Sequence, residues 1–456
     1  MDIDATRPVR LAILGTGNRG GDVYGGWALR HPDRARIVAV ADPRHERRDR
    51  LADAAGIAAT DRFDDWRDLI AAAGRLQLDA VIVALPDREH VEPALAAAEL
   101  GVDILLEKPA ASTPEDLERI SARARRLGAR IFVGHVLRYT PFWQTVRQIV
   151  ASGAIGRLLT IRHEENIGFW HFAHSFVRGN WRRADTSSPM VLAKTCHDLD
   201  LIHWLADAAP RTVASSGALT VFRPENAPPG APQRCLDGCP AAASCAFYAP
   251  RFYVDALAGS DRWPITVLTT DPSPEGRLDA LRTGPYGRCV YRCDNDVADH
   301  QQTVMNFADG LTATLSTSGL TGQNTRTVQL TGAAGELTGH MGSGRIVVDL
   351  FAPTAQLPPL PLARDLREDV RPPALQRTIE LIAAPPDDHA GHGGGDAALM
   401  EAFVTGVATG TLGEAHGASL EHALDSHRMA FAAEESRLTG ATVTLATPTV
   451  SDAATR

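Results

Sequence analysis

The feature that most limits what this chain can fold into is a glycine-rich turn directly after its first apolar run. The turn is Gly15-Thr16-Gly17-Asn18-Arg19-Gly20, and Arg10–Leu14 before it has the character of a buried strand. In a strand–turn–helix unit the first glycine allows the tight turn. The second lets the backbone approach a pyrophosphate, which sits at the positive end of the helix, and the third lets helix and strand pack closely. We therefore predict a dinucleotide site with contacts from Gly15, Gly17, Asn18, Arg19 and Gly20.

The first 138 residues repeat a strand–helix pattern. Amphipathic stretches such as Val91–Leu100 and Pro114–Leu127 separate further short apolar runs, at Arg36–Ala41, Ala80–Leu85, Val102–Leu106 and Arg130–Val133. Apolar strands that alternate with helices are typical of a parallel sheet covered on both faces. Right-handed crossovers then give a doubly wound α/β Rossmann domain, which we assign to residues 1–138.

The pattern changes after residue 139. Strand candidates become longer and alternate in polarity, as in Leu158–Glu165 and Thr312–Ser318, which favours an antiparallel or mixed sheet. We therefore expect a second, α+β domain over residues 139–456. An irregular insertion rich in Pro, Gly and Cys interrupts it at about 222–300.

Composition and charge argue against several kinds of partner. The chain has 456 residues and a net charge of -9, which is unlike a nucleic-acid-binding surface. It contains no run of about 18 apolar residues, so no membrane span is expected. The acidic start carries no secretory signal pattern, and we predict a cytoplasmic protein.

Asp42 bears on the choice of cofactor. It ends the second apolar run, a little over twenty residues past the glycines. A carboxylate at this position accepts hydrogen bonds from ribose hydroxyls and repels a 2′-phosphate. We therefore predict NAD rather than NADP, although Arg44 nearby is a residue type that accommodates a phosphate.

Two loops after later strands resemble those of a known family. Glu107-Lys108-Pro109 follows the run 102–106, and Ala84-Leu85-Pro86, with His90 opening a helix, follows the run before it. Together with the glycine turn they resemble the Gfo/Idh/MocA family, named for glucose–fructose oxidoreductase and inositol dehydrogenase. The resemblance implies an NAD(P)-dependent oxidoreductase with cofactor contacts at Pro86, His90 and Glu107. It also implies a C-terminal domain whose open, mostly antiparallel sheet covers the nicotinamide, and we expect a homo-oligomer formed through that sheet.

The same resemblance places Lys108 beside the reacting carbon. Oxidising a hydroxyl removes a hydride and a proton, and a positioned cation lowers the cost of the developing alkoxide charge and relays the proton. Lys108 follows a strand whose carboxyl end faces the ligand crevice of a doubly wound sheet. A surface lysine paired with Glu107 is the structural alternative.

A helix predicted over residues 189–205, from a Ser-Pro start, carries the second half of the expected site. In the family, a histidine matching His197 lies near the substrate, with an aspartate four positions earlier. This chain has Ala193 there, followed by Lys194, which is a candidate replacement. A pairing of Lys194 with Asp198 at i+4 is the structural alternative. The catalytic candidates are therefore Lys108, His197 and Lys194.

Two other segments are candidates for substrate binding. The stretch 171–182 mixes histidines, arginines and aromatic residues. Arginine forks bind anionic groups, and tryptophan can stack on a sugar ring. A glycine run at 393–395 lets backbone approach a ligand beside His392, while N-capping by Asp396 would explain the same segment structurally. The substrate-binding candidates are His174, Arg178, Trp181, Arg182 and His392.

The insertion holds five of the chain's six cysteines. They are Cys235, Cys239 and Cys245, followed by Cys289 and Cys293. Five thiols on two irregular segments predict a structural zinc held by four of them, which would stabilise a region with little apolar content. An iron–sulfur cluster and plain buried thiols are the alternatives.

Together these patterns predict hydride transfer between NAD and a secondary hydroxyl of a sugar, glycoside or cyclitol. The first alternative is an NAD-dependent glycoside hydrolase that works by transient oxidation at C3 and elimination, with Lys194, His197 and His174 as its extra bases. The second is a non-catalytic, cofactor-dependent sensor. NADH accumulation with glycosides would indicate the dehydrogenase, and sugar release without NADH the hydrolase.

Overall fold

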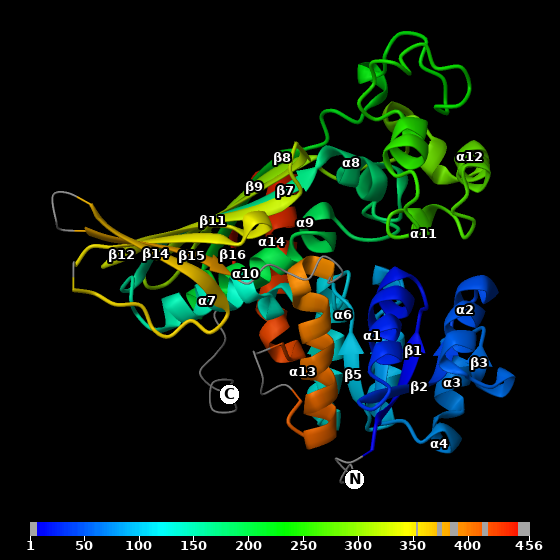
Figure 1. The fold of residues 1–456 in the computed structure, drawn as a ribbon, viewed down its shortest axis with the longest axis horizontal. Coiled ribbons are helices and arrows are strands. Elements are labelled where there is room, and N and C mark those ends of the chain that lie inside the picture. Colours follow the sequence, from blue (N-terminus) through cyan, green and yellow to red (C-terminus); the bar gives the residue numbers. More distant parts are fainter. Residues whose placement is uncertain (1–6, 353, 372–375, 384–390, 413–417, 446–456) are drawn as a thin grey trace.

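The fold is described from a computed structural model that covers residues 7–352, 354–371, 376–383, 391–412 and 418–445. The outer ends of the two predicted domains, residues 1–6 and 446–456, lie outside the described residues. The chain forms two sheet-based units that lie against each other (Figure 1).

The N-terminal unit is a parallel sheet with strand order β3-β2-β1-β4-β5-β6, the doubly wound order expected from the sequence. Its strands are β1 (Val9–Leu14), β2 (Ala35–Ala41), β3 (Arg62–Phe63), β4 (Ala80–Val83), β5 (Asp103–Leu106) and β6 (Ile131–Val133). The helices between them are α1 (Gly26–Arg30), α2 (His45–Ala55), α3 (Trp66–Ala71), α4 (Ala73–Leu76), α5 (Val91–Glu99) and α6 (Pro114–Leu127).

Local signals explain the helix bounds. The α6 helix begins after Thr113, whose side chain accepts a hydrogen bond from the backbone N–H of Asp116, and Pro114 stands at its first position. It ends at Gly128, which adopts the left-handed conformation (φ 63°) that favours glycine. The bounds predicted for this helix are confirmed.

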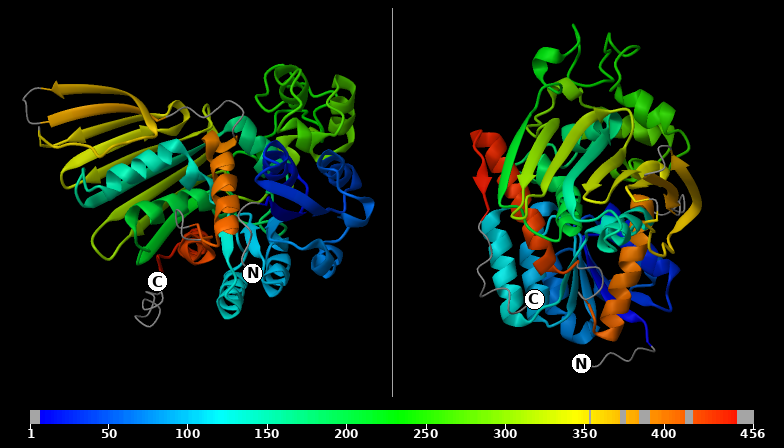
Figure 2. Two further views of the ribbon diagram at one scale, coloured as in Figure 1. Left: turned by 60° about the horizontal axis from the view of Figure 1, so that its bottom comes forward. Right: turned by 90° about the vertical axis from the view of Figure 1, so that its left-hand side faces the viewer.

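Successive residues of β1 point to opposite faces of the sheet. Leu11 and Ile13 belong to one buried cluster, and Ala12 and Leu14 to another. Two helices from the end of the chain complete these clusters: α13 (Gly395–Thr409) adds to the first, and α14 (Leu420–Thr439) to both. Figure 2 shows both helices, orange and red, returning to the N-terminal unit. Residues predicted to belong to the second domain thus help to form the core of the first.

The C-terminal unit is an open sheet in which only the β7–β10 pair among the described strands is parallel. This confirms the mostly antiparallel sheet. In spatial order the strands are β14 (Ala363–Arg371), β15 (Gln376–Ala383), β13 (Arg345–Leu350), β12 (Gly335–His340), β11 (Thr325–Gly332), β7 (Leu158–Gly168), β10 (Thr312–Thr321), β9 (His300–Asn306), β8 (Thr212–Ala218) and β16 (Val443–Thr444).

One face of this sheet is covered and the other is open. Side chains alternate between buried and partly or fully exposed along β9, β10 and β11. The buried side packs against α7 (Pro141–Ala151), α10 (Cys196–Ala206) and α14. The open side carries exposed apolar residues such as Val304 and Leu320. Assembly of copies through this face stays a prediction.

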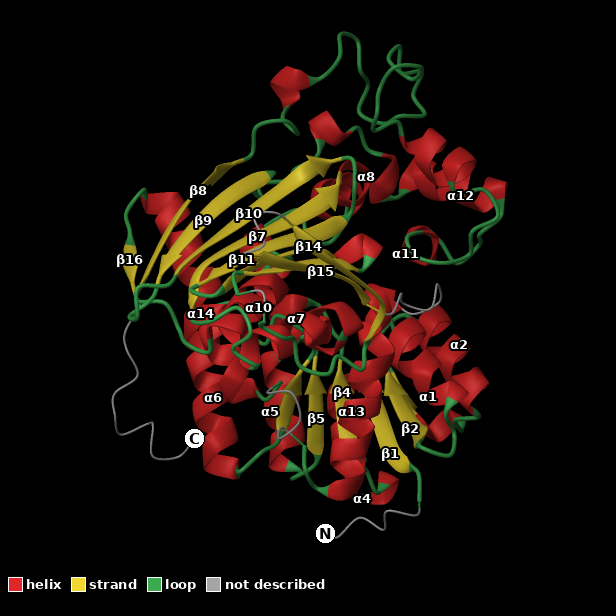
Figure 3. Cartoon of the chain, turned by 60° about the vertical axis from the view of Figure 1, so that its left-hand side comes forward, coloured by secondary structure: helices red, strands yellow, loops and turns green. Residues whose placement is uncertain are grey.

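Along the sequence, the insertion connects β8 to β9. In space it lies beyond the end of the sheet (Figure 3). It contains α11 (Ile265–Leu268) and α12 (Pro274–Thr283), together with single turns of helix. A small core of its own includes Tyr253, Leu281 and Tyr286. Among the described residues, no helix is both long and apolar enough to cross a membrane.

The return of α13 to the N-terminal core can be tested at Phe403. Its side chain is fully buried, and its ring lies 5.9 Å from that of Phe132 on β6. Phe403→Ala should lower the free energy of unfolding by about 3–5 kcal/mol, because it leaves a cavity. Urea unfolding of the whole chain measures this. Leu438→Ala, at an exposed position of α14, is the control and should change stability by less than about 0.5 kcal/mol. Equal effects of the two changes would contradict the packing described.

Candidate active site

The glycine turn has the geometry that a dinucleotide requires. Gly15 has a φ of 88°, and a Cβ there would collide with the carbonyl oxygen of Ala84. A Cβ at Gly20 would collide with the carbonyl oxygen of Gly15, so the turn and the following helix pack without side chains between them. Around Gly17 the nearest atom to a Cβ is 3.8 Å away, on Arg47. The helical stretch predicted after the turn is present, as a π-helical segment at Asn18–Gly25 that continues into α1.

Asp42 holds the turn in place. It is 3% exposed, and its Oδ2 accepts a hydrogen bond from the backbone N–H of Thr16 at 2.8 Å. Its Oδ1 accepts one from the backbone N–H of Arg44 at 2.9 Å. The carboxylate thus connects the end of β2 to the glycine turn, at the edge where the ribose of a dinucleotide would lie.

Arg19 and Glu107 are engaged with each other. Arg19 Nε donates to Glu107 Oε1 at 2.5 Å, and Arg19 NH1 pairs with Asp396 of α13 at 2.9 Å. The Tyr24 hydroxyl also donates to Glu107. Burial alone would raise the pKa of Glu107, but the charges of Arg19 and Lys108 outweigh it and hold that pKa below its usual value. Asp396, predicted as a possible N-cap, makes no capping bond; it pairs with Arg19 and His392 instead.

His90 and Pro86 lie in the loop after β4. The buried His90 ring contacts two carbonyl oxygens, that of Pro109 at 2.7 Å and that of Leu85 at 2.8 Å. It therefore joins the loops after β4 and β5. Asp87, next to Pro86, accepts hydrogen bonds from side chains of the segment 181–188, which ties the same loop to the C-terminal unit.

Lys108 reaches across to the second unit. It follows β5, and its Nζ donates to the carbonyl oxygen of Ala193 at 2.7 Å. That oxygen is available because the helix predicted over 189–205 is wrong as one element: α9 (Met190–Ala193) ends before α10 begins at Cys196. The Thr195 hydroxyl donates to the carbonyl oxygen of Val191, four residues back, a bond that competes with regular helix and bends it.

His197 lies in the first turn of α10 and is 4% exposed. Its ring is 5.9 Å from that of His135, after β6, and 6.2 Å from that of His392, measured between centroids. Burial, and next the charge of Lys108, lower its pKa well below the usual value, so the imidazole is neutral near pH 7. Its Nδ1 has no hydrogen-bond partner among the described residues. A neutral imidazole with a free nitrogen can accept a hydrogen bond or a proton.

Lys194 stands at the break between α9 and α10. Its Nζ lies 3.3 Å from Glu165 Oε1 on β7. Asp198, its predicted structural partner, instead binds Arg326 and His163, each at 2.7 Å. Burial lowers the pKa of Lys194 from its usual value, although Glu165 opposes the shift. Lys194 therefore lies within this break, and Lys108, which follows β5, contacts the same break through the Ala193 carbonyl oxygen.

The predicted substrate loop at 171–182 is mostly engaged by the chain itself. The buried Arg178 donates to the carbonyl oxygens of Arg288 and Phe247, both at 2.8 Å. His174 contacts the Tyr253 hydroxyl at 2.7 Å, and burial lowers its pKa to about 3. Trp181 Nε1 donates to Asp87, and Arg182 pairs with Asp294. The contacts of Arg178, His174 and Arg182 connect this loop to the insertion, and the Nε and NH2 groups of Arg178 are engaged within the chain.

Of the substrate-binding candidates, His392 is the one whose ring lies close to that of His197. It precedes α13 with a φ of 49°, unusual for a residue other than glycine, and its Nδ1 lies 3.0 Å from Asp396 Oδ2. Its side chain is 40% exposed while Asp396 is buried. Through Asp396 and Arg19, His392 is connected to the glycine turn.

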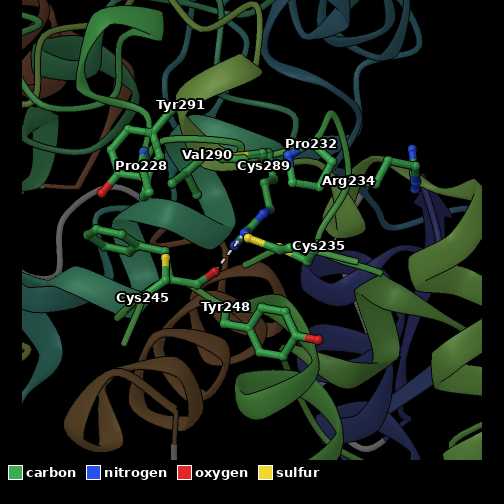
Figure 4. A pocket seen from close by; sticks show the side chains of 13 residues that line it. Pro228, Pro232, Arg234, Cys235, Cys245, Tyr248, Cys289, Val290 and Tyr291 are labelled. Atoms are coloured by element: carbon green, nitrogen blue, oxygen red, sulfur yellow. Dashed lines mark hydrogen bonds between the residues drawn. The ribbon is translucent and has the colours of Figure 1, made fainter. Parts of the chain in front are cut away.

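Four of the cysteines surround one small pocket (Figure 4). Cys235, Cys239, Cys245 and Cys289 line it together with Arg178, whereas the Cys293 thiol donates to the carbonyl oxygen of Cys289. As the side chains stand, no group of three or more His, Cys, Asp or Glu in the described part of the chain could hold a metal ion. The prediction of a structural zinc held by four of the five cysteines therefore receives no support from the structure.

Sequence analysis did not identify His135, whose ring lies near that of His197, or Glu165, which pairs with Lys194. His135 lies two residues after β6, whose carboxyl end faces the same crevice, so its position in the fold could have identified it. Burial lowers its pKa to about 3. The only indication for Glu165 is weak: the alternating pattern of β7 predicts that this acidic residue lies on the covered face of the sheet, where a carboxylate is unusual.

A parallel nucleotide-binding sheet whose edge meets a second, sheet-based unit defines a two-domain protein of the Rossmann class. Comparison with known proteins identifies the family. The chain matches the "Oxidoreductase family, NAD-binding Rossmann fold" over residues 9–135 and the "Oxidoreductase family, C-terminal alpha/beta domain" over residues 147–445. It belongs to the Gfo/Idh/MocA oxidoreductases.

Individual relatives are more distant. The chain is 29% identical over 211 residues to 2,7-anhydro-N-acetylneuraminate hydratase of Mediterraneibacter gnavus, covering 46% of this chain and 53% of that protein. It is 30% identical over 205 residues to inositol 2-dehydrogenase of Rubrobacter xylanophilus, covering 44% and 52%. The chain thus aligns with about half the length of these curated relatives. A levoglucosan dehydrogenase in complex with NADH and levoglucosan shares its fold, with a TM-score of 0.67 at 16% identity, over 97% of this chain and 100% of that one.

The Arg19 network predicts a specific pH dependence of stability. In the wild type, the lowered pKa values of Glu107 and Asp396 mean that this stabilisation is complete above about pH 5 and is lost as acid protonates them. In Arg19→Gln the lowering effect of the guanidinium is lost, so burial should raise the pKa values of both Glu107 and Asp396. The buried charges should then lower the free energy of unfolding by about 3–5 kcal/mol at pH 7, and the deficit should shrink as the pH falls.

Urea unfolding between pH 4 and pH 8, without added cofactor, measures the deficit. Arg345→Gln removes an exposed pair with Glu380 and serves as the control, with an expected change below about 1 kcal/mol at any pH. A deficit in Arg19→Gln that grows on acidification would contradict the assigned charges.

Proposed function

We propose that this protein is an NAD-dependent oxidoreductase that transfers a hydride from a secondary hydroxyl of a sugar, glycoside or cyclitol. The observation that carries the proposal is the hydrogen bond from Lys108 Nζ to the Ala193 carbonyl oxygen. This oxygen lies at the break between α9 and α10, close to His197 in the first turn of α10. The cation comes from the carboxyl end of a Rossmann strand, and the neutral base comes from the second domain. Family membership, the inositol dehydrogenase relative and the levoglucosan dehydrogenase fold support a carbohydrate substrate.

The residues fit a bound dinucleotide. The glycine turn leaves room for a pyrophosphate, and Asp42 lies at the ribose end. NAD, when bound, supplies a hydride acceptor. We also propose that NAD is preferred to NADP, because the Asp42 carboxylate disfavours a 2′-phosphate.

Two side chains of this chain handle the substrate hydroxyl in the proposal. Lys108, held by the Ala193 carbonyl, presents an ammonium that stabilises negative charge on the oxygen as it loses its proton. His197, neutral and with an unpartnered nitrogen, accepts that proton. The His392 ring lies 6.2 Å from the His197 ring, measured between centroids, and its side chain is 40% exposed.

Replacing Lys108 tests this assignment. Lys108→Met and His197→Ala should each lower kcat by at least about a hundredfold, because proton-transfer assistance contributes about 10²–10⁴ in rate. NADH formation with myo-inositol, levoglucosan and simple glucosides measures kcat. NAD affinity, measured by calorimetry, should change little, since the phosphate and ribose contacts lie elsewhere. Near-normal turnover by Lys108→Met would show that the active site is misplaced.

A second candidate function is cleavage or hydration of a glycoside-like substrate without net redox change. The similarity to a 2,7-anhydro-N-acetylneuraminate hydratase and the second lysine of the site favour it. Incubation of glycosides with a trace of NAD separates the two functions. Stoichiometric NADH indicates the dehydrogenase, and product without NADH indicates the redox-neutral reaction.

A further inference from the structure

Three aromatic side chains lie together beside the proposed active site, and the chemistry proposed above does not use them. Trp170 and His171 belong to the short helix α8 (Phe169–Phe172), and Trp263 belongs to the insertion, just before α11. The Trp263 ring lies 5.8 Å from the Trp170 ring and 5.0 Å from the His171 ring, measured between centroids. The Trp170 and His171 rings are stacked at 5.5 Å. We call these three side chains the aromatic wall.

The aromatic wall keeps accessible surface. Each of its three residues is only partly buried. Tryptophan is highly buried on average, so two adjoining tryptophans that both remain accessible are unusual. Binding sites for small molecules typically combine aromatic side chains with a few polar groups that fix orientation. The wall therefore has the composition of a binding surface.

The aromatic wall continues the proposed active site along β7. Glu165, near the carboxyl end of that strand, lies 3.3 Å from Lys194 Nζ. The strand ends at Gly168, and Trp170 and His171 follow at once on α8. Burial, and next the charge of Lys194, lower the pKa of His171 well below its usual value, so its ring is neutral near pH 7. A group bound at the wall would therefore adjoin a substrate held at the active site.

His171 supplies the aromatic wall with a hydrogen-bond acceptor. The side-chain oxygen of Asn324 accepts hydrogen bonds from the backbone N–H of Gly168 at 3.1 Å and from His171 Nδ1 at 2.9 Å. Nδ1 therefore carries the proton of the neutral ring. Nε2 makes no hydrogen bond within the described part of the chain, and it can accept one from a hydroxyl.

The insertion holds Trp263 in place. The His174 ring lies 5.4 Å from the Trp263 ring and is stacked at 4.7 Å on Tyr286. His174 also contacts the Tyr253 hydroxyl, and Arg178 donates to two backbone carbonyl oxygens of the insertion. Figure 1 and Figure 3 both show α11 beside α8, above the nucleotide-binding unit. These contacts position Trp263 before a ligand arrives, which lowers the entropic cost of binding.

We propose that the aromatic wall is a subsite for a second sugar ring, joined by a glycosidic bond to the ring that is oxidised. The inference rests on the proposed function and narrows its substrate class to disaccharides and similar glycosides. The C–H face of the second ring packs against Trp170 and Trp263, and one of its hydroxyls donates to His171 Nε2. A purely aromatic group would use the two tryptophans but not the histidine nitrogen.

Matched substrates test the subsite. NADH formation gives kcat/KM for cellobiose against methyl β-D-glucoside, and for maltose and trehalose against methyl α-D-glucoside. In the wild type, at least one disaccharide should exceed its methyl glucoside by about tenfold or more. Trp263→Ala should lower that ratio at least about fivefold, whereas Trp263→Phe, which keeps a ring, should retain most of it. Phe351→Ala, at an exposed residue near the opposite end of the sheet, is the control and should leave the ratio unchanged.

His171→Phe distinguishes a sugar from an aromatic aglycone. The change keeps a ring but removes the acceptor nitrogen. It should therefore lower kcat/KM for the preferred disaccharide at least about threefold more than kcat/KM for phenyl β-D-glucoside. An equal or larger loss with phenyl β-D-glucoside would overturn the assignment of the subsite to a sugar ring.

Two other results would overturn the subsite while leaving the proposed function intact. One is a wild type that forms NADH from methyl glucosides or myo-inositol but prefers no disaccharide. The other is a ratio in Trp263→Ala within twofold of the wild type. Calorimetry on the NADH-saturated protein, which cannot oxidise an alcohol, measures sugar binding alone. Tighter binding of a disaccharide than of its methyl glucoside, without NADH formation from any of these alcohols in the presence of NAD, would support the subsite and count against the proposed function.

Discussion

The hydrogen bond from the Lys108 ammonium to the Ala193 carbonyl oxygen connects the two domains at the proposed active site. That oxygen is available because the helix is interrupted between α9, which ends at Ala193, and α10, which begins at Cys196. The interruption also sets the direction of Lys194 and starts a new helix with His197 in its first turn. One local defect in helix geometry thus determines the positions of three side chains of the proposed active site.

Much of this arrangement was predictable from the sequence, for physical reasons. Apolar runs at strand spacing, a glycine turn and helix caps are local signals, and they predict the doubly wound sheet and the bounds of α6. Lys108 was also predictable, because residues after parallel strands face the crevice. His135 follows the same rule after β6 and could have been found in the same way.

Other features depend on partners far away in the sequence. Arg178 and His174 resemble ligand-binding residues, but an arginine fork binds backbone carbonyls as readily as a substrate anion. The helix break at Lys194 coincides with a bond from the Thr195 hydroxyl to the Val191 carbonyl oxygen, which periodicity does not reveal. Five thiols on two irregular segments suggested a metal, yet their number alone does not determine whether the sulfur atoms lie at ligand distance from a common point.

The return of α13 to the first domain has a consequence for how the chain acquires its structure during synthesis. The nucleotide-binding sheet comes from the first third of the chain, but Phe403 and Asp396, which complete one face and neutralise Arg19, are made near its end. While α13 is still missing, the N-terminal unit therefore exposes apolar surface, and Arg19 lacks its ion pair with Asp396. The core of the nucleotide-binding unit is therefore completed only after α13 has been made and has packed against it.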